Sequence, residues 1–243
     1  MNSFSVISRG SEKLGFGGDP RLYPKFSVLD PEVTYSLPEK QLGNGIVDAF
    51  VHTTEQYLTT HNHTPLQDRQ AEAVLLTLIE EAPKVIELKE HYPSRANFMW
   101  AATNALNGMI GLGVAHDWAT HMIGHELTAL YNIDHARSLA IILPSLLRTL
   151  KDQKREKLLQ FAERIWGLHS GTPEERIENA ILKTEDFFNS VGVPTTFKAY
   201  GIEESEIPKI VESVEKHFSK DFALGEAGNV DSTKAAEILK GAF

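Results

Sequence analysis

Cysteine is absent from the 243 residues of this chain. Without a thiol, the chain forms no disulfide, performs no thiolate chemistry and offers no cysteine-based zinc site. No apolar run approaches the about 18 residues that a membrane-spanning helix needs. No block of lysine or arginine stands out, and the net charge is -9, so neither a nucleic acid nor a membrane is expected as a partner. The N-terminus lacks the basic-then-apolar order of a signal peptide, and a cytoplasmic location is expected.

The first 36 residues differ in pattern from the rest of the sequence. Two runs with strand-like character, SFSVISR at 3–9 and KFSVLD at 25–30, flank a turn rich in glycine and proline. A pair of strands is marginally stable by itself, so we expect these two to belong to a larger sheet. The glycines at 15, 17 and 18 are followed by no helical pattern, which predicts a loop rather than a dinucleotide-binding turn.

From residue 37 onward the sequence is helical in pattern. Apolar residues recur at helical spacing over several ranges: 43–58, 68–86, 157–166, 172–188, 205–218 and 231–241. Thr172 and Glu175 form a capping box at the start of one of them. The run 95–113 is apolar nearly all round, which is typical of a central, buried helix. The predicted fold class is mainly α, with a β-hairpin in 1–36 and one helical domain in 37–243.

Three of the ten histidines lie in the stretch DWATHMIGHELTALYNIDH, residues 117–135. His121 and His125 are four residues apart and therefore share a helical face, and His135 follows after a turn. The zinc-peptidase motif H-E-x-x-H is absent because Met122 stands in the glutamate position. A helical peptidase is therefore disfavoured.

Asp48 and His52 repeat the four-residue spacing in an earlier predicted helix, IVDAFVHT. Both helices are otherwise apolar around these residues, so their polar groups are expected to point inward or into a cleft. Burying them without partners costs on the order of several kcal/mol, and a bound cation removes much of that cost. One aspartate and three histidines suit a divalent iron or zinc ion. On spacing alone, histidines that are only core or surface residues remain an alternative.

Other polar residues near these helices have simpler interpretations. Asp117 is expected to cap the helix that carries His121. The remaining histidines lie in polar or loop-like stretches and are expected to be exposed to solvent: His61, His63, His91, His116, His169 and His217.

Three segments, VDAFVHTTEQY, DWATHMIGHELTALYNIDHARSLAIILP and RANFMWAATNALNG, strongly resemble the iron-containing (group III) alcohol dehydrogenases. Within that family they resemble the branch of NADPH-dependent aldehyde reductases and butanol dehydrogenases, over nearly the whole chain. The resemblance implies a helical metal-binding domain like the C-terminal domain of dehydroquinate synthase. It also implies hydride transfer between a nicotinamide cofactor and a small aldehyde or primary alcohol. The implied cofactor is NADP(H), and NAD(H) is less favoured. A homo-oligomer is expected for the full-length form.

The same resemblance assigns roles to individual residues. It implies four ligands for one Fe²⁺ or Zn²⁺ ion: Asp48, His52, His121 and His135. His125 then becomes a group beside the nicotinamide and a candidate for proton handling. Asn2 and Lys13 match positions near the cofactor, although the loop that carries Lys13 is one residue shorter here.

Family members carry an α/β dinucleotide-binding domain of about 100–150 residues ahead of this region. Met1 and Asn2 resemble the end of the family motif T-G-S-E-M-N, and the Gly-rich pyrophosphate loop is missing. We therefore expect the metal-binding part of a two-domain enzyme, whether from a truncated gene, a gene model begun at an internal Met, or a fragment. By itself it is expected to be inactive. The alternatives are a metal-binding helical module that needs a partner chain for the nucleotide, and a helical scaffold without metal.

Overall fold

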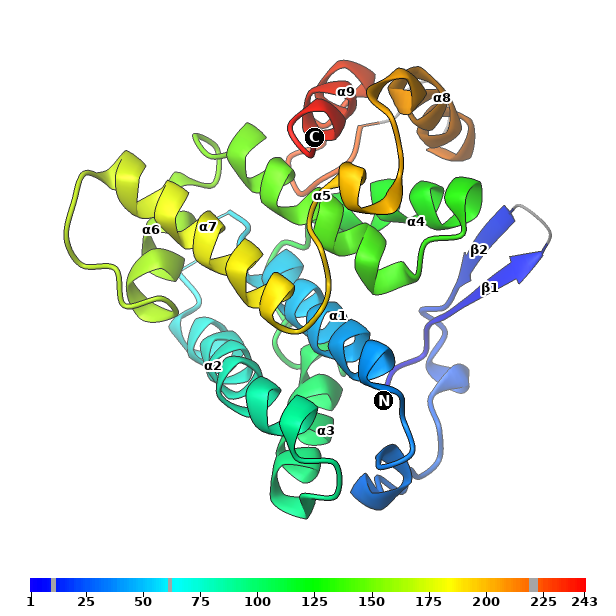
Figure 1. Cartoon of the computed structure of the whole chain (residues 1–243), viewed down its shortest axis with the longest axis vertical. Coiled ribbons are helices and arrows are strands. Elements are labelled where there is room, and N and C mark those ends of the chain that lie inside the picture. The colour runs from blue at the N-terminus through cyan, green and yellow to red at the C-terminus, as the bar shows by residue number, and fades with distance from the viewer. Residues whose placement is uncertain (10–11, 61–62, 219–222) are drawn as a thin grey trace.

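The computed structural model describes residues 1–9, 12–60, 63–218 and 223–243 (Figure 1). Most of this part of the chain is helical, as the sequence predicted. The elements are, in order, β1 (Ser5–Arg9), β2 (Glu12–Phe16), η1 (Pro20–Leu22), η2 (Pro31–Thr34), α1 (Glu39–Tyr57), α2 (Pro65–Glu87), α3 (Tyr92–Ala105), α4 (Ala119–Tyr131), α5 (His135–Thr149), α6 (Arg155–Arg164), α7 (Pro173–Ser190), η3 (Phe197–Tyr200), η4 (Glu204–Glu206), α8 (Ile207–Phe218) and α9 (Ser232–Lys240).

Helices α1 and α5 pack against each other near the middle of the molecule (Figure 1). Helix α5 has a continuous apolar run, Leu139–Leu143, and all five of these residues are buried. Helix α1 buries Ile46, Val47 and Phe50 completely. Helices α2 and α3 cover one side of α1, while α4, α7 and α9 contact α5. The centre of the molecule is therefore formed by the two helices that carry Asp48, His52 and His135.

The prediction of a central, buried helix over 95–113 is wrong. The helix is α3, it ends at Ala105, and it lies at the outside of the molecule against α1 and α2. Trp100 is 62% exposed, and the side chains that α3 buries most deeply include the small residues Ala101 and Ala105. An apolar composition all round a helix does not show which side faces the core, because no polar face sets the orientation.

The N-terminal strands pair differently from the prediction. Strand β1 runs antiparallel to β2 with Val6 opposite Gly15, so the second strand is 12–16 rather than 25–30. Phe26 and Val28, which suggested a strand, are each 83% exposed and lie outside any strand. The strand pattern of 25–30 was misleading because β1 pairs with the nearer segment. Within the described residues the sheet has two strands and is not part of a larger one.

Two local predictions, the capping box at Thr172 and the short helices near the C-terminus, are confirmed. The capping box of Thr172 and Glu175 is present at the start of α7, with each side chain bonded to the other residue's backbone. Short helices α8 and α9 lie within the ranges expected near the C-terminus. Among the described residues, no helix has both the length and the apolar character that crossing a membrane requires. The division of the chain at residue 36 stays a prediction, although α1 begins close to it, at Glu39.

Candidate metal centre

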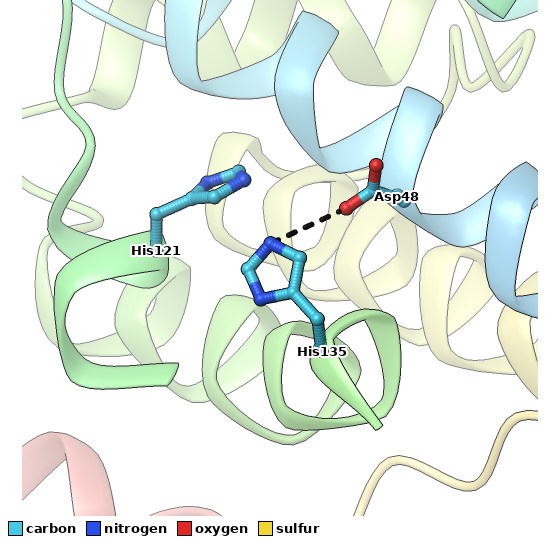
Figure 2. Close-up of side chains that lie close together, drawn as sticks. All are labelled: Asp48, His121 and His135. Carbon is cyan, nitrogen blue, oxygen red and sulfur yellow. Dashed lines mark ion pairs between the residues drawn. The ribbon is translucent and has the colours of Figure 1, made fainter. Parts of the chain in front are cut away.

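Asp48, His121 and His135 come together from three helices, α1, α4 and α5. One ligand atom of each lies within 4.8 Å of those of the other two. Figure 2 shows the His135 ring and the Asp48 carboxylate pointing toward each other, with Nε2 3.5 Å from Oδ1. These residues are far apart in the sequence, and they converge because α5 packs against both α1 and α4.

His52 adjoins this group from α1. Its Nε2 atom lies 3.1 Å from the Nε2 atom of His121, and its Nδ1 atom lies 3.2 Å from Oδ2 of Asp48. The Nδ1 atom is also 2.8 Å from the carbonyl oxygen of Asp48. Two ring nitrogens that face each other at this distance repel unless a proton or a cation lies between them. The four side chains predicted as ligands are therefore neighbours.

Electrostatics favour an ionised Asp48. Burial alone would raise the pKa of its carboxyl group, but the hydrogen bond with His52 and the nearby histidine charges lower this pKa to about 2. For His52, burial acts to lower the pKa, and the hydrogen bond and charge of Asp48 outweigh it, so the pKa is raised. The Asp48 carboxylate is therefore ionised at neutral pH and lies beside imidazole rings, of which His52 keeps its proton to a higher pH than usual.

The residues present fit a divalent cation. Asp48 Oδ1 is shielded from solvent, yet it has no hydrogen-bond donor among the described residues. A buried carboxylate oxygen without a donor is costly, and a cation removes that cost. Carboxylate oxygen and imidazole nitrogen are ligands that both iron and zinc accept.

The centre is open on one side. The Asp48 and His135 side chains are each about one-third exposed, at 33% and 31%, whereas His121 is buried. A pocket of about 390 Å³ borders these two partly exposed side chains, and Asn44 and Asp134 contribute to its wall. An open side is what a catalytic metal site needs, since a small molecule must reach the ion.

The other predicted site residues have different surroundings. His125 is half-buried, its ring centre lies 5.1 Å from that of His135, and it is not one of the three residues whose possible ligand atoms lie within 4.8 Å of one another. Asn2 donates a hydrogen bond of 2.9 Å to the carbonyl oxygen of Leu106, just after α3. The side chain of Lys13 lies outside the described residues. The cofactor roles of Asn2 and Lys13 therefore stay predictions.

The histidines outside the centre are mostly as predicted. His63, His91, His116 and His169 are exposed. His61 and the side chain of His217 lie outside the described residues.

Glu55 is a residue of the site that the sequence interpretation missed. Its side chain is buried, at 3% exposure, and Oε2 lies against Nδ1 of His121. Burial raises the pKa of Glu55 to about 8, with a further contribution from the charge of Asp117. The signal was present in the sequence, because Glu55 follows Asp48 by seven residues and His52 by three, and so shares their helical face.

Trp118 is a second missed residue, and its backbone is strained. It has a positive φ of 59°, which is unfavourable for a bulky side chain. Its ring meets His121 edge-on, with 5.3 Å between ring centres, and its Nε1 donates to Nδ1 of His116. Helix α4 begins after it, at Ala119, whose N–H donates to Oδ1 of Asp117 as a cap would require.

The described residues thus form a helical domain in which an aspartate and three histidines lie together beside an open pocket, an arrangement typical of a metal-binding site. The family model for the C-terminal part of the Fe-containing alcohol dehydrogenase family matches residues 44–240. The chain therefore belongs to this family, and the resemblance stated from the sequence is confirmed.

The curated relatives are oxidoreductases. The chain is 52% identical over 218 residues to the NADPH-dependent aldehyde reductase YqhD of Escherichia coli, covering 89% of this chain and 56% of that protein. It is 36% identical over 242 residues to a probable NADH-dependent butanol dehydrogenase of Bacillus subtilis, covering 98% of this chain and 61% of the relative. The chain thus spans little more than half the length of these proteins.

Solved structures share the fold. The crystal structure of YqhD from E. coli K-12 matches with a TM-score of 0.96 and 48% identity, over 100% of this chain and 62% of that one. The NADH-dependent butanol dehydrogenase A of Thermotoga maritima matches with a TM-score of 0.93 and 34% identity, again over 100% and 62%. The predicted fold class, mainly α with an N-terminal β-hairpin, is confirmed.

Proposed function

We propose that this chain is the metal-binding part of an NAD(P)-dependent alcohol dehydrogenase or aldehyde reductase. It binds one divalent ion, Fe²⁺ or Zn²⁺, through Asp48, His52, His121 and His135. The observation that carries the proposal is the convergence of these side chains from α1, α4 and α5 around Asp48 Oδ1, which has no hydrogen-bond donor among the described residues. The names of the relatives support the reaction class.

Each group in the centre has a part in the proposed reaction. The ion, when bound, supplies Lewis acidity toward the oxygen of the aldehyde or alcohol. Asp48 offsets positive charge, and the neutral imidazoles supply nitrogen lone pairs. The pocket beside Asp48 and His135 admits a small substrate. His125, close to His135, exchanges the proton of the alcohol hydroxyl group.

The nucleotide preference belongs to the proposal as well. NADP(H) is favoured over NAD(H) because the relative with 52% identity is NADPH-dependent, whereas the relative with 36% identity is named for NADH. Asn2 and Lys13 are the residues of this chain proposed to lie near the cofactor. The complete enzyme is proposed to be a cytoplasmic homo-oligomer.

The test combines metal analysis with activity. We expect the purified chain to contain close to one equivalent of metal, and to oxidise NADPH with an aldehyde only after the remaining part of the E. coli relative is supplied as a separately expressed segment. Hydride transfer needs the nicotinamide held against the substrate, and such positioning is worth about 7–11 kcal/mol of the barrier.

The possible results separate the candidates. Turnover at a family-like rate by the 243 residues alone would contradict the expected inactivity. Metal without activity in any combination would favour a metal-binding module. If the chain bound no metal at saturating Zn²⁺ or Fe²⁺, a helical scaffold without metal would be the remaining interpretation.

A further inference from the structure

We infer that Glu55 is a positioning residue of the metal centre, which fixes both the ring and the backbone of His121 relative to α1. This inference rests on the proposed metal-binding function. The Glu55 side chain is buried, and its two carboxylate oxygens face the first turn of α4. Glu55 itself is not among the four proposed ligands.

The two carboxylate oxygens of Glu55 contact different groups of α4. Oε1 accepts a hydrogen bond of 2.7 Å from the backbone N–H of Thr120, and the N–H of His121 lies 3.4 Å away. The N-cap residue Trp118 makes no side-chain cap bond, so a carboxylate from another helix satisfies this helix terminus. Burial opposes the ionised form of Glu55, whereas the N–H groups of Thr120 and His121 favour it. In that form the negative charge also lies at the positive end of the α4 dipole, which is favourable.

Oε2 determines the orientation of the imidazole. It lies against Nδ1 of His121, and when Glu55 is ionised this oxygen can only accept. The proton of a neutral His121 ring is therefore held on Nδ1, and the lone pair is on Nε2. That atom is on the side of the ring where Nε2 of His52 lies, 3.1 Å away. A carboxylate behind a ligating histidine in this way sets its tautomer and increases its basicity.

Glu55 also connects ligands on different helices. It lies on α1 one turn after His52, so the element that carries two proposed ligands orients the third. Its own carbonyl oxygen accepts from the N–H of Asp117, at 2.9 Å, and Asp117 Oδ2 lies 2.8 Å from Nζ of the buried Lys154. The start of α4 is therefore tied to α1 by both the side chain and the backbone of Glu55.

The substitution Glu55→Gln tests the inference. Glutamine has the same shape but one acceptor oxygen, so it accepts from Thr120 or from His121 and not from both. We expect the affinity for Zn²⁺, measured by competition with a chromophoric chelator, to fall about 10- to 100-fold. Glu126→Gln is the matched control, because Glu126 is also 3% exposed, lies on α4 and accepts from Ser213. It should leave zinc affinity within about 2-fold of wild type.

A second measurement does not depend on any variant. Long-range ¹H–¹⁵N correlation spectra of the metal-free wild-type protein, recorded above pH 8 where Glu55 is ionised, should show His121 with its proton on Nδ1. Glu55→Gln should shift it toward a mixture of tautomers. A proton on Nε2 in the wild type, or unchanged zinc affinity in Glu55→Gln, would overturn the inference. Failure of the wild type to bind zinc would instead overturn the proposed function, while the tautomer would still decide the role of Glu55.

Discussion

At the scale of single residues, His121 and His125 have different surroundings although they lie one helical turn apart on α4. His121 is buried and contributes a ring nitrogen to the group with Asp48 and His135. His125 is half-buried, and its ring centre lies 6.2 Å from that of His121. A spacing of one helical turn therefore does not give the two histidines the same surroundings. We propose different roles for them, which substitution can separate.

We expect His121→Ala to lower metal affinity by at least about 100-fold, since loss of a ligand costs more than loss of an outer hydrogen-bond partner. His125→Ala should keep most of the metal, because this ring stands beside the ligand group. Metal analysis of the purified variants measures both effects. Equal metal content in wild type and His121→Ala would rule out the proposed ligand set.

Protons compete with metal at the same nitrogens, so binding should depend on pH. The pKa of His52 is raised, because its interactions with Asp48 outweigh the effect of burial, and the protonated ring therefore persists above the usual pKa of about 6.5. Affinity for Zn²⁺ should consequently increase with pH between about 5 and 8. A titration series across that range measures it, and a flat profile would argue against histidine ligation.

At the scale of elements, the accuracy of the sequence interpretation depended on whether a pattern was local. The capping box at Thr172 was predicted correctly, because all its atoms belong to one helical turn. The helix over 95–113 and the strand over 25–30 were misjudged, because burial and strand pairing depend on segments elsewhere in the chain. Composition and periodicity contain no information about those neighbours.

The candidate site was predictable to a similar extent. Spacing paired Asp48 with His52 and suggested that His121 faces the same cleft, and the resemblance supplied His135 as a ligand. Glu55 was missed because one of its partners is the backbone N–H of Thr120, 65 residues later. Helical spacing places Glu55 on the face of Asp48 and His52, but it does not show which distant helix terminus the carboxylate contacts.

Lys154 is a buried cation that contacts the carboxylates of Asp117 and Glu226. Its replacement tests how much these ion pairs contribute to the stability of the fold. Lys154, just before α6, has a side chain 1% exposed, and its Nζ lies 2.8 Å from Asp117 and 2.6 Å from Glu226. Removing one partner of a buried ionic group leaves the other charges uncompensated, which costs about 3–5 kcal/mol. We expect Lys154→Met to reduce the free energy of unfolding in urea by that amount. The exposed Lys151→Met is the control, and equal stability of the two variants would contradict this account.

At the scale of the whole molecule, the proposed ligands link α1, α4 and α5, so metal binding and folding are coupled. An ion that binds the folded chain but not the unfolded one stabilises it by about 2.7 kcal/mol at a free concentration 100 times Kd. For a chain of this length, 1 kcal/mol raises Tm by about 2–4 °C, which gives an increase of about 5–10 °C. Scanning calorimetry with Zn²⁺ and after chelation measures this shift. His121→Ala should show little of this increase in Tm, because its site lacks a proposed ligand. An increase in Tm as large as that of wild type would mean that zinc stabilises the protein from another site.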